Sequence, residues 1–100
     1  MISHVVILNL SRRVSPAQKA SILHAIQSMR DSVPNISHME YGFNIGLSGE
    51  EDASFSILAK FESREDYISY ANHPAHLQFI EQYLKPIVSP DGRRAIQYEV

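Results

Sequence analysis

Residues 70–76, which read Tyr-Ala-Asn-His-Pro-Ala-His, gather side chains well suited to acid–base chemistry. His76 falls in the first turn of a helix that Pro74 is expected to begin. It shares an apolar stripe with Phe79 and Tyr83, so its ring should point inward. The positive end of that helix disfavours a protonated imidazole, and a neutral imidazole can accept a proton near pH 7. The alternative is a core histidine that is hydrogen-bonded to the backbone.

Two further side chains could take part in the same chemistry. Tyr70 could orient the His76 imidazole or polarise a substrate carbonyl, although a core tyrosine with a hydrated hydroxyl is the alternative. His4 lies on the same strand face as Val6 and Leu8. If that face meets the helices, the His4 ring enters the same cavity and could hold a substrate oxygen. The competing interpretation is a strand histidine that finds its hydrogen bond locally.

His73 precedes Pro74, and we predict that it caps the helix that follows. His73 and His76 have the His-x-x-His spacing of metal sites, and His4 could add a third ligand. Cysteine is absent and the proline removes the pair from regular helical geometry, so we predict no metal site. The sequence also has no Gly-rich phosphate loop and no cofactor fingerprint, so no organic cofactor is expected.

Composition narrows the classes of protein to which the chain can belong. One hundred residues with 44% apolar side chains fit one domain, residues 1–100. The net charge is −2 and the basic residues are dispersed, so no nucleic-acid partner is expected. No segment approaches membrane-spanning length and no export signal is visible, so we expect a cytoplasmic protein with no membrane partner.

Hydrophobic periodicity predicts strands over residues 2–10, 36–45, 54–61 and 93–100, and helices over residues 16–33, 64–72 and 74–84. Ser15, Pro16 and Gln18 have the spacing of a capping box at the start of the first helix. Residues 46–52 are predicted to form an acidic loop. The order is βαββαβ, which predicts an α+β fold of the ferredoxin-like type with both helical regions on one sheet face.

The sheet face away from the helices should be unusually apolar. Val5 and Ile7 lie on it in the first strand, Leu58 in the third, and the last strand adds Ile96 and Tyr98 on one side. An antiparallel sheet with one hydrated face alternates more cleanly, so a second sheet should cover this face, most simply from an identical subunit. The alternative is that these residues only reflect strand propensity. We therefore predict a homodimer.

Several short motifs carry a resemblance to a known family. They are residues 4–6 (His-Val-Val), Val14-Ser15, residues 61–63 (Phe-Glu-Ser), and residues 70–76 followed by Phe79. With this order and spacing the chain resembles the stress-responsive dimeric α/β-barrel (Dabb) domain family. The resemblance implies a homodimer whose two sheets form a barrel-like core, with one cavity per subunit between sheet and helices.

The same resemblance bears on the candidate residues. A few members of the family are polyketide cyclases that use a histidine and a tyrosine for acid–base work, and these correspond here to His76 and Tyr70. In those cyclases a further histidine begins the third strand, where this chain has Phe55. A cyclase with the same substrate is therefore not expected.

Two functions remain open. The first is an enzyme without an organic cofactor, in which His76 removes a proton alpha to the carbonyl of a small apolar compound, Tyr70 assists and His4 holds an oxygen. The second is a non-catalytic dimeric module that binds a hydrophobic metabolite or acts as a stress-associated partner. In both cases the predicted pocket is lined by one set of residues: Val6, Leu8, Leu23, Ile26, Met39, Phe55, Ile57, His73, Phe79 and Tyr83.

Overall fold

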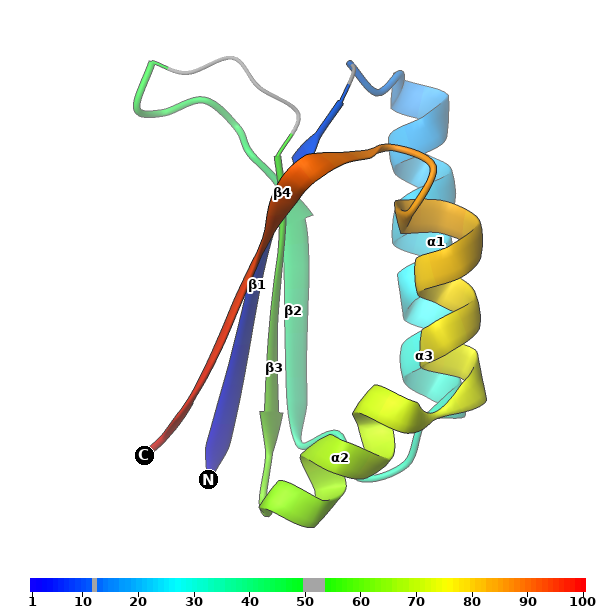
Figure 1. Ribbon diagram of the computed structural model, residues 1–100. Coiled ribbons are helices and arrows are strands. Elements are labelled where there is room, and N and C mark those ends of the chain that lie inside the picture. The colour runs from blue at the N-terminus through cyan, green and yellow to red at the C-terminus, as the bar shows by residue number, and fades with distance from the viewer. Residues whose placement is uncertain (12, 50–53) are drawn as a thin grey trace.

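The helices of this fold lie on one face of a four-stranded antiparallel sheet, as Figure 1 shows for the computed structural model. The structure describes residues 1–11, 13–49 and 54–100. The acidic part of the loop predicted over residues 46–52, at Glu50, Glu51 and Asp52, lies outside the described residues.

The elements follow the predicted order. The strands are β1 (Ile2–Leu10), β2 (His38–Phe43), β3 (Phe55–Phe61) and β4 (Val88–Glu99). They are arranged β2-β3-β1-β4 in the sheet. The helices are α1 (Pro16–Ser32), α2 (Arg64–Asn72), α3 (Pro74–Phe79) and the π-helix η1 (Ile80–Leu84). The βαββαβ prediction is confirmed, with α2, α3 and η1 forming the second helical region.

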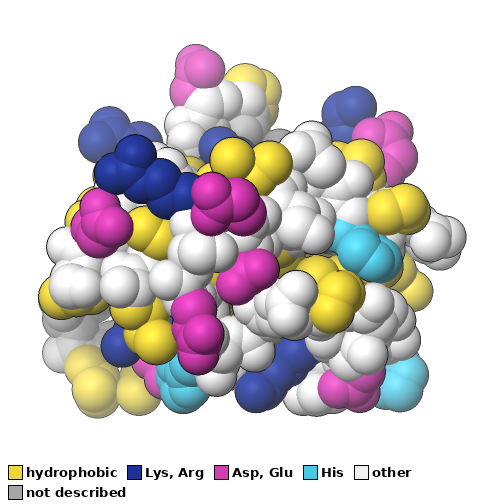
Figure 2. All heavy atoms as spheres, turned by 90° about the horizontal axis from the view of Figure 1, so that it is seen from below, with side chains coloured by type: hydrophobic (Ala, Val, Ile, Leu, Met, Phe, Trp, Pro, Cys, Tyr) yellow, Lys and Arg dark blue, Asp and Glu magenta, His cyan; other side chains and the backbone are white. Residues whose placement is uncertain are grey.

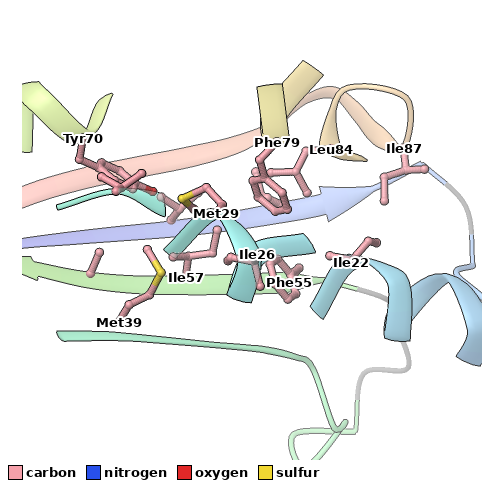
Figure 3. Packing of buried hydrophobic residues seen from close by; sticks show 14 of the residues in the cluster. Ile22, Ile26, Met29, Met39, Phe55, Ile57, Tyr70, Phe79, Leu84 and Ile87 are labelled. Carbon is pink, nitrogen blue, oxygen red and sulfur yellow. The ribbon is translucent and has the colours of Figure 1, made fainter. Parts of the chain in front are cut away.

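Ser15 begins α1 as the sequence predicts. Its hydroxyl accepts a hydrogen bond from the Gln18 backbone N–H at 3.1 Å, and the Gln18 side chain accepts one from the Ser15 N–H at 2.9 Å. This reciprocal box satisfies N–H groups that the first helical turn leaves unpaired. The helix buries Ile22, Ile26 and Met29, and Figure 3 shows all three pointing from α1 into the core.

Three strands differ in length from the prediction, and β3 differs only by beginning at Phe55 instead of Ser54. β2 is shorter at both ends than residues 36–45, and β4 begins at Val88 instead of Arg93. An irregular register at the end of β1 lets the chain around Pro90 and Gly92 join the sheet, where β4 is an edge strand that tolerates a proline. A Cβ atom on Gly92 would lie 2.5 Å from the Asn9 carbonyl oxygen, so the close approach of the two strands requires glycine.

The second helical region ends in a wider turn than the sequence predicts. The Lys85 N–H donates to the Ile80 carbonyl at 2.8 Å, five positions back, which makes this segment a π-helix. The extra residue in the turn rotates the side chains after Ile80 away from their places in a regular α-helix. Leu84 is buried, whereas Tyr83, which was predicted to follow the His76 stripe, is half-buried and stacks on Phe79.

The two faces of the sheet have different surroundings. His4 and Leu8 share the helix-covered face of β1 and are buried, which confirms the face predicted for His4. On the opposite face, Ile7, Ile96 and Tyr98 are 48%, 56% and 49% exposed. No described element of the chain covers these three residues, which together with Val5 and Leu58 form what we call the open face.

Charged groups of both signs are mixed at the end of the molecule where α2 and both termini lie (Figure 2). Among the helices that the structure describes, none is both long and apolar enough to cross a membrane.

Candidate functional site

A pocket lies between the helix-covered face of β1 and β4 and the helical segment formed by α3 and η1. Its volume is about 320 Å³, at the lower end of the range for small-molecule sites. Most of its wall is apolar, and its polar groups are His4, Tyr70, His76, Glu81, Lys85 and Arg93. The structure thus brings the three predicted catalytic residues together in one cavity.

The hydrogen bond made by His76 decides which of its ring nitrogens carries the proton. Nδ1 lies 3.1 Å from the Ala71 carbonyl oxygen. A carbonyl oxygen can only accept, so Nδ1 is the N–H and Nε2 holds a lone pair. No described residue forms a hydrogen bond with Nε2. His76 is therefore bonded to the backbone, as the alternative interpretation had it, but it keeps a nitrogen that can accept a proton.

Tyr70 packs directly against His76. The two ring centroids are 4.2 Å apart and the Tyr70 side chain is buried. Figure 3 shows Tyr70 reaching from α2 along the sheet toward Phe79, which is part of the pocket wall. No described residue shares a hydrogen bond with the Tyr70 hydroxyl, so this group is available to a ligand.

His4 has the opposite tautomer to His76. The register of β1 and β4 pairs His4 with Gln97, whose side-chain Nε2 lies 2.9 Å from His4 Nδ1. An amide nitrogen can only donate, so His4 Nδ1 accepts and the ring proton is on Nε2. The His4 ring also lies 5.0 Å from Tyr67 and 6.0 Å from Tyr70, centroid to centroid. His4 thus presents a donor where His76 presents an acceptor.

The environment keeps both imidazoles uncharged near pH 7. Burial lowers the pKa of His4 to about 4, and the charges of Arg93 and His76 contribute to the same shift. Burial also lowers the pKa of His76. The hydrogen bond to Ala71 opposes that shift, and Arg93 and His73 add to it. A neutral imidazole with a lone pair is the form that acts as a base.

The Tyr70 phenol stays protonated for a related reason. Burial raises its pKa well above the usual range, Tyr67 adds to the rise, and the positive charge of Arg93 opposes it. Tyr70 can therefore donate a hydrogen bond at neutral pH.

The structure places four of the ten predicted lining residues in the pocket wall: Val6, Leu8, Ile57 and Phe79. The other six do not line it: Leu23, Ile26, Met39, Phe55, His73 and Tyr83.

Each of these six has a physical reason to lie elsewhere. Ile26, Met39 and Phe55 are part of the core, and Leu23 packs at its edge. The ring centroids of Phe55 and Phe43 are 4.6 Å apart. His73 is held as the cap of α3, because its Nδ1 accepts a hydrogen bond from the Ala75 N–H at 3.1 Å, as predicted. Tyr83 stacks on Phe79, with the ring centroids 6.0 Å apart, and lies beside α1 outside this pocket.

Three polar residues of the pocket were not foreseen: Glu81, Lys85 and Arg93. Glu81 lies in η1 and Lys85 directly follows it, and the sequence has no local signal for this π-helix. Arg93 could have been found, because alternation along the last strand places it on the face opposite Ile96 and Tyr98, which is the face that meets the helices.

Comparison with known proteins identifies the family of this chain and supports its fold. The family model of the stress responsive A/B barrel domain (Dabb) matches residues 2–100. Olivetolic acid cyclase of Cannabis sativa is 24% identical over 83 residues, which are 82% of this chain and 82% of the cyclase.

Two solved structures illustrate the likeness in fold. A dimeric ferredoxin-like protein of Thermobifida fusca has a TM-score of 0.84 and 20% identity, with 99% of this chain and 90% of that chain covered. A hydroxynitrile lyase of Passiflora edulis has a TM-score of 0.77 and 17% identity, with 97% and 90% covered. The predicted ferredoxin-like fold is confirmed by these similarities.

Proposed function

Because the chain belongs to the stress responsive A/B barrel domain family, we propose that it is a homodimer in which each subunit holds a pocket for a small carbonyl compound. His76 removes a proton alpha to the carbonyl, while His4 and Tyr70 donate hydrogen bonds to the oxygen that gains negative charge. This enolisation is the step shared by cyclisations and isomerisations. No organic cofactor takes part.

The opposite tautomers of the two histidines carry this proposal. His76 offers a lone pair at Nε2 because its Nδ1–H is bonded to Ala71, and His4 offers an N–H at Nε2 because its Nδ1 is bonded to Gln97. Proton removal next to a carbonyl needs an acceptor for the proton and a donor for the oxygen at the same time. One pocket holds both.

The bond between His76 and Ala71 also suits a base that must become charged. When Nε2 takes up a proton, the Nδ1–H still donates to the Ala71 carbonyl, and a hydrogen bond from a charged donor is stronger than one from a neutral donor. The imidazolium is thereby stabilised in place and can return the proton to another carbon or oxygen of the same substrate.

The relatives support chemistry on small organic compounds. Olivetolic acid cyclase and hydroxynitrile lyase are named for reactions of this kind. The dimer is supported by the Thermobifida fusca protein, which is described as dimeric, and by the open face with exposed Ile7, Ile96 and Tyr98. Covering an apolar surface of that kind is a sufficient reason for two sheets to associate.

Exchange of the methyl protons of acetophenone in D₂O, followed by proton NMR, tests the proposal without knowledge of the natural substrate. The wild-type protein should accelerate exchange over buffer, and the H76A variant should lose the acceleration. H24A is the matched control, because His24 is an exposed histidine of α1 outside this pocket. Equal rates for wild type and H76A would refute the role of His76.

The pH profile of that exchange gives a second measurement. Because the pKa of His76 is lowered from the ordinary value of 6.5, the base is uncharged at neutral pH. The rate should be level around pH 7 and should fall only below pH 6.5, as the imidazole takes up a proton.

One observation favours the second function, a pocket that binds without turnover. Phe55 stands at the position that the family resemblance assigns to a histidine in cyclases, and it is buried in the core instead of lining the pocket. A binding module would show acetophenone-dependent shifts of the His4 and His76 ring signals, with no acceleration of exchange in the wild-type protein.

A further inference from the structure

Arg93 is an exposed cation of β4, and the sheet fixes the face to which it projects. The register pairs Arg93 with Leu8 across β1 and β4, and directly paired residues project to the same side of a sheet. Leu8 is buried against the helices, so the Arg93 side chain starts on the helix-covered face, and it forms part of the pocket wall.

The positive charge of Arg93 has no counter-charge in the described part of the chain. Among the residues that the structure describes, Glu81 is the one carboxylate of the pocket wall, and its Oε2 pairs with Lys85 Nζ at 3.1 Å. No described carboxylate lies within ion-pair distance of Arg93. With both histidines neutral, the described residues of the pocket wall carry one net positive charge.

That charge acts on the groups proposed for catalysis. It contributes to the lowered pKa of His4 and His76 and counteracts the rise for Tyr70. The guanidinium is therefore close enough for a ligand that touches these three groups to feel it.

We infer that the ligand of this pocket is an acid, with its carboxylate bound by Arg93 and its carbonyl held at His4, Tyr70 and His76. A guanidinium matches a carboxylate through two parallel hydrogen bonds, which favours this anion over a neutral group. This inference rests on the proposed function, which gives the position of the reacting carbonyl.

The register also separates the two ends of such a ligand. His4 and Leu8 are four positions apart on β1, which corresponds to about 13 Å of strand, and a flexible arginine side chain spans part of that distance. The carboxylate and the reacting carbonyl should therefore lie at opposite ends of the ligand, several bonds apart, with an apolar body between them against Val6 and Phe79.

Para-acetylbenzoate has this arrangement, and para-acetylbenzamide is its neutral counterpart of the same shape. Titration calorimetry should show that the wild-type protein binds the acid more tightly than the amide. The R93Q variant should lose about tenfold or more in affinity for the acid, with little change for the amide. R93K, which keeps the charge but not the planar pair of donors, should retain part of the preference.

R94Q is the matched control. Arg94 pairs with Ile7 and so projects to the open face of the sheet, away from the pocket. R94Q should keep the wild-type preference for the acid, with its melting temperature and sedimentation recorded to exclude a change of fold or assembly.

The outcomes separate this inference from the proposed function. Equal affinity for acid and amide in the wild type, a preference that survives R93Q, or no binding of the acid at millimolar concentration would overturn the role of Arg93. None of these binding results changes the conclusion about His76 as the base, which is tested by acetophenone exchange. Conversely, an Arg93-dependent preference without any exchange would support the acidic ligand and refute the catalytic proposal.

Discussion

The burial of His4 should make the stability of the protein depend on pH in the weakly acidic range. The ring is 3% exposed, and its pKa is lowered from 6.5 to about 4 in the folded state. In the unfolded chain the imidazole takes up a proton below about pH 6.5, whereas the folded protein takes it up only near pH 4. The unfolded state therefore binds more protons between these two values, and stability falls as the pH falls through this window.

The size of the effect follows from the difference between the two pKa values. A difference of about 2.5 between the folded and unfolded states corresponds to a loss of at most about 3 kcal/mol between pH 7 and pH 4. Domains of this size are stable by about 5–15 kcal/mol, so this loss is a large share of the total.

Urea unfolding at several pH values between 7.5 and 4.5, at one protein concentration, measures the dependence. The H4F variant keeps an aromatic ring against Tyr67 and Tyr70 but cannot be protonated, so its stability should fall less steeply than that of the wild type. The H24Q variant alters an exposed histidine and should keep the wild-type slope. Identical slopes for H4F and wild type would refute the reasoning, because carboxylates titrate equally in both proteins.

Two further substitutions test the assembly and the sheet. I96K on the open face should convert the dimer to a monomer in a sedimentation experiment, because it buries an unpaired ammonium group in an apolar interface; a dimer that is unchanged, or a wild-type protein that is monomeric at micromolar concentration, would contradict the use of this face. G92A should lower the free energy of unfolding by about 1–3 kcal/mol, because its Cβ would meet the Asn9 carbonyl. G42A is the control, since a Cβ there has nothing within 4 Å, and equal stabilities for the two variants would contradict the close approach of β1 and β4.

The features that the sequence predicted correctly depend on neighbours along the chain. The capping box of Ser15 and Gln18 spans three positions, and the cap of His73 on α3 spans two. The face of His4 follows from alternation within one strand, which is decided by the side-chain period of two. Such signals are readable because the competing conformations differ locally in hydrogen bonding or in exposure.

The features that could not be predicted depend on contacts between distant segments. The Gly92 position is constrained by the Asn9 carbonyl, which belongs to the first strand. The π-helix η1, which holds Glu81 and precedes Lys85, is a rare alternative to the α-helix and has no local sequence signature. The sequence therefore predicted a pocket too deep in the core, among Ile26, Met39 and Phe55, where the helices and the sheet are closely packed.

The roles of the two histidines show the same division between local and distant causes. Ala71 is five positions from His76, so a backbone partner for this ring belongs to the local turn. Gln97 is 93 positions from His4 and meets it only through the register of β1 and β4. A different register would leave His4 Nδ1 without its donor, and the ring could then take the other tautomer.

Both histidines line the pocket, so the hydrogen bonds at their Nδ1 atoms are needed to decide which of them is the base. Protonation of His4 would place an N–H at Nδ1 against the present Gln97 amide donor. Independently of that contact, burial and the charges of Arg93 and His76 lower the pKa of His4 to about 4. Protonation of His76 conflicts with no existing hydrogen bond, because its Nδ1 already donates to Ala71. Of the two histidines in this cavity, His76 can gain a proton with its hydrogen bond unchanged, whereas His4 could do so only if the Gln97 amide turned to present its oxygen. His4 is therefore left to donate.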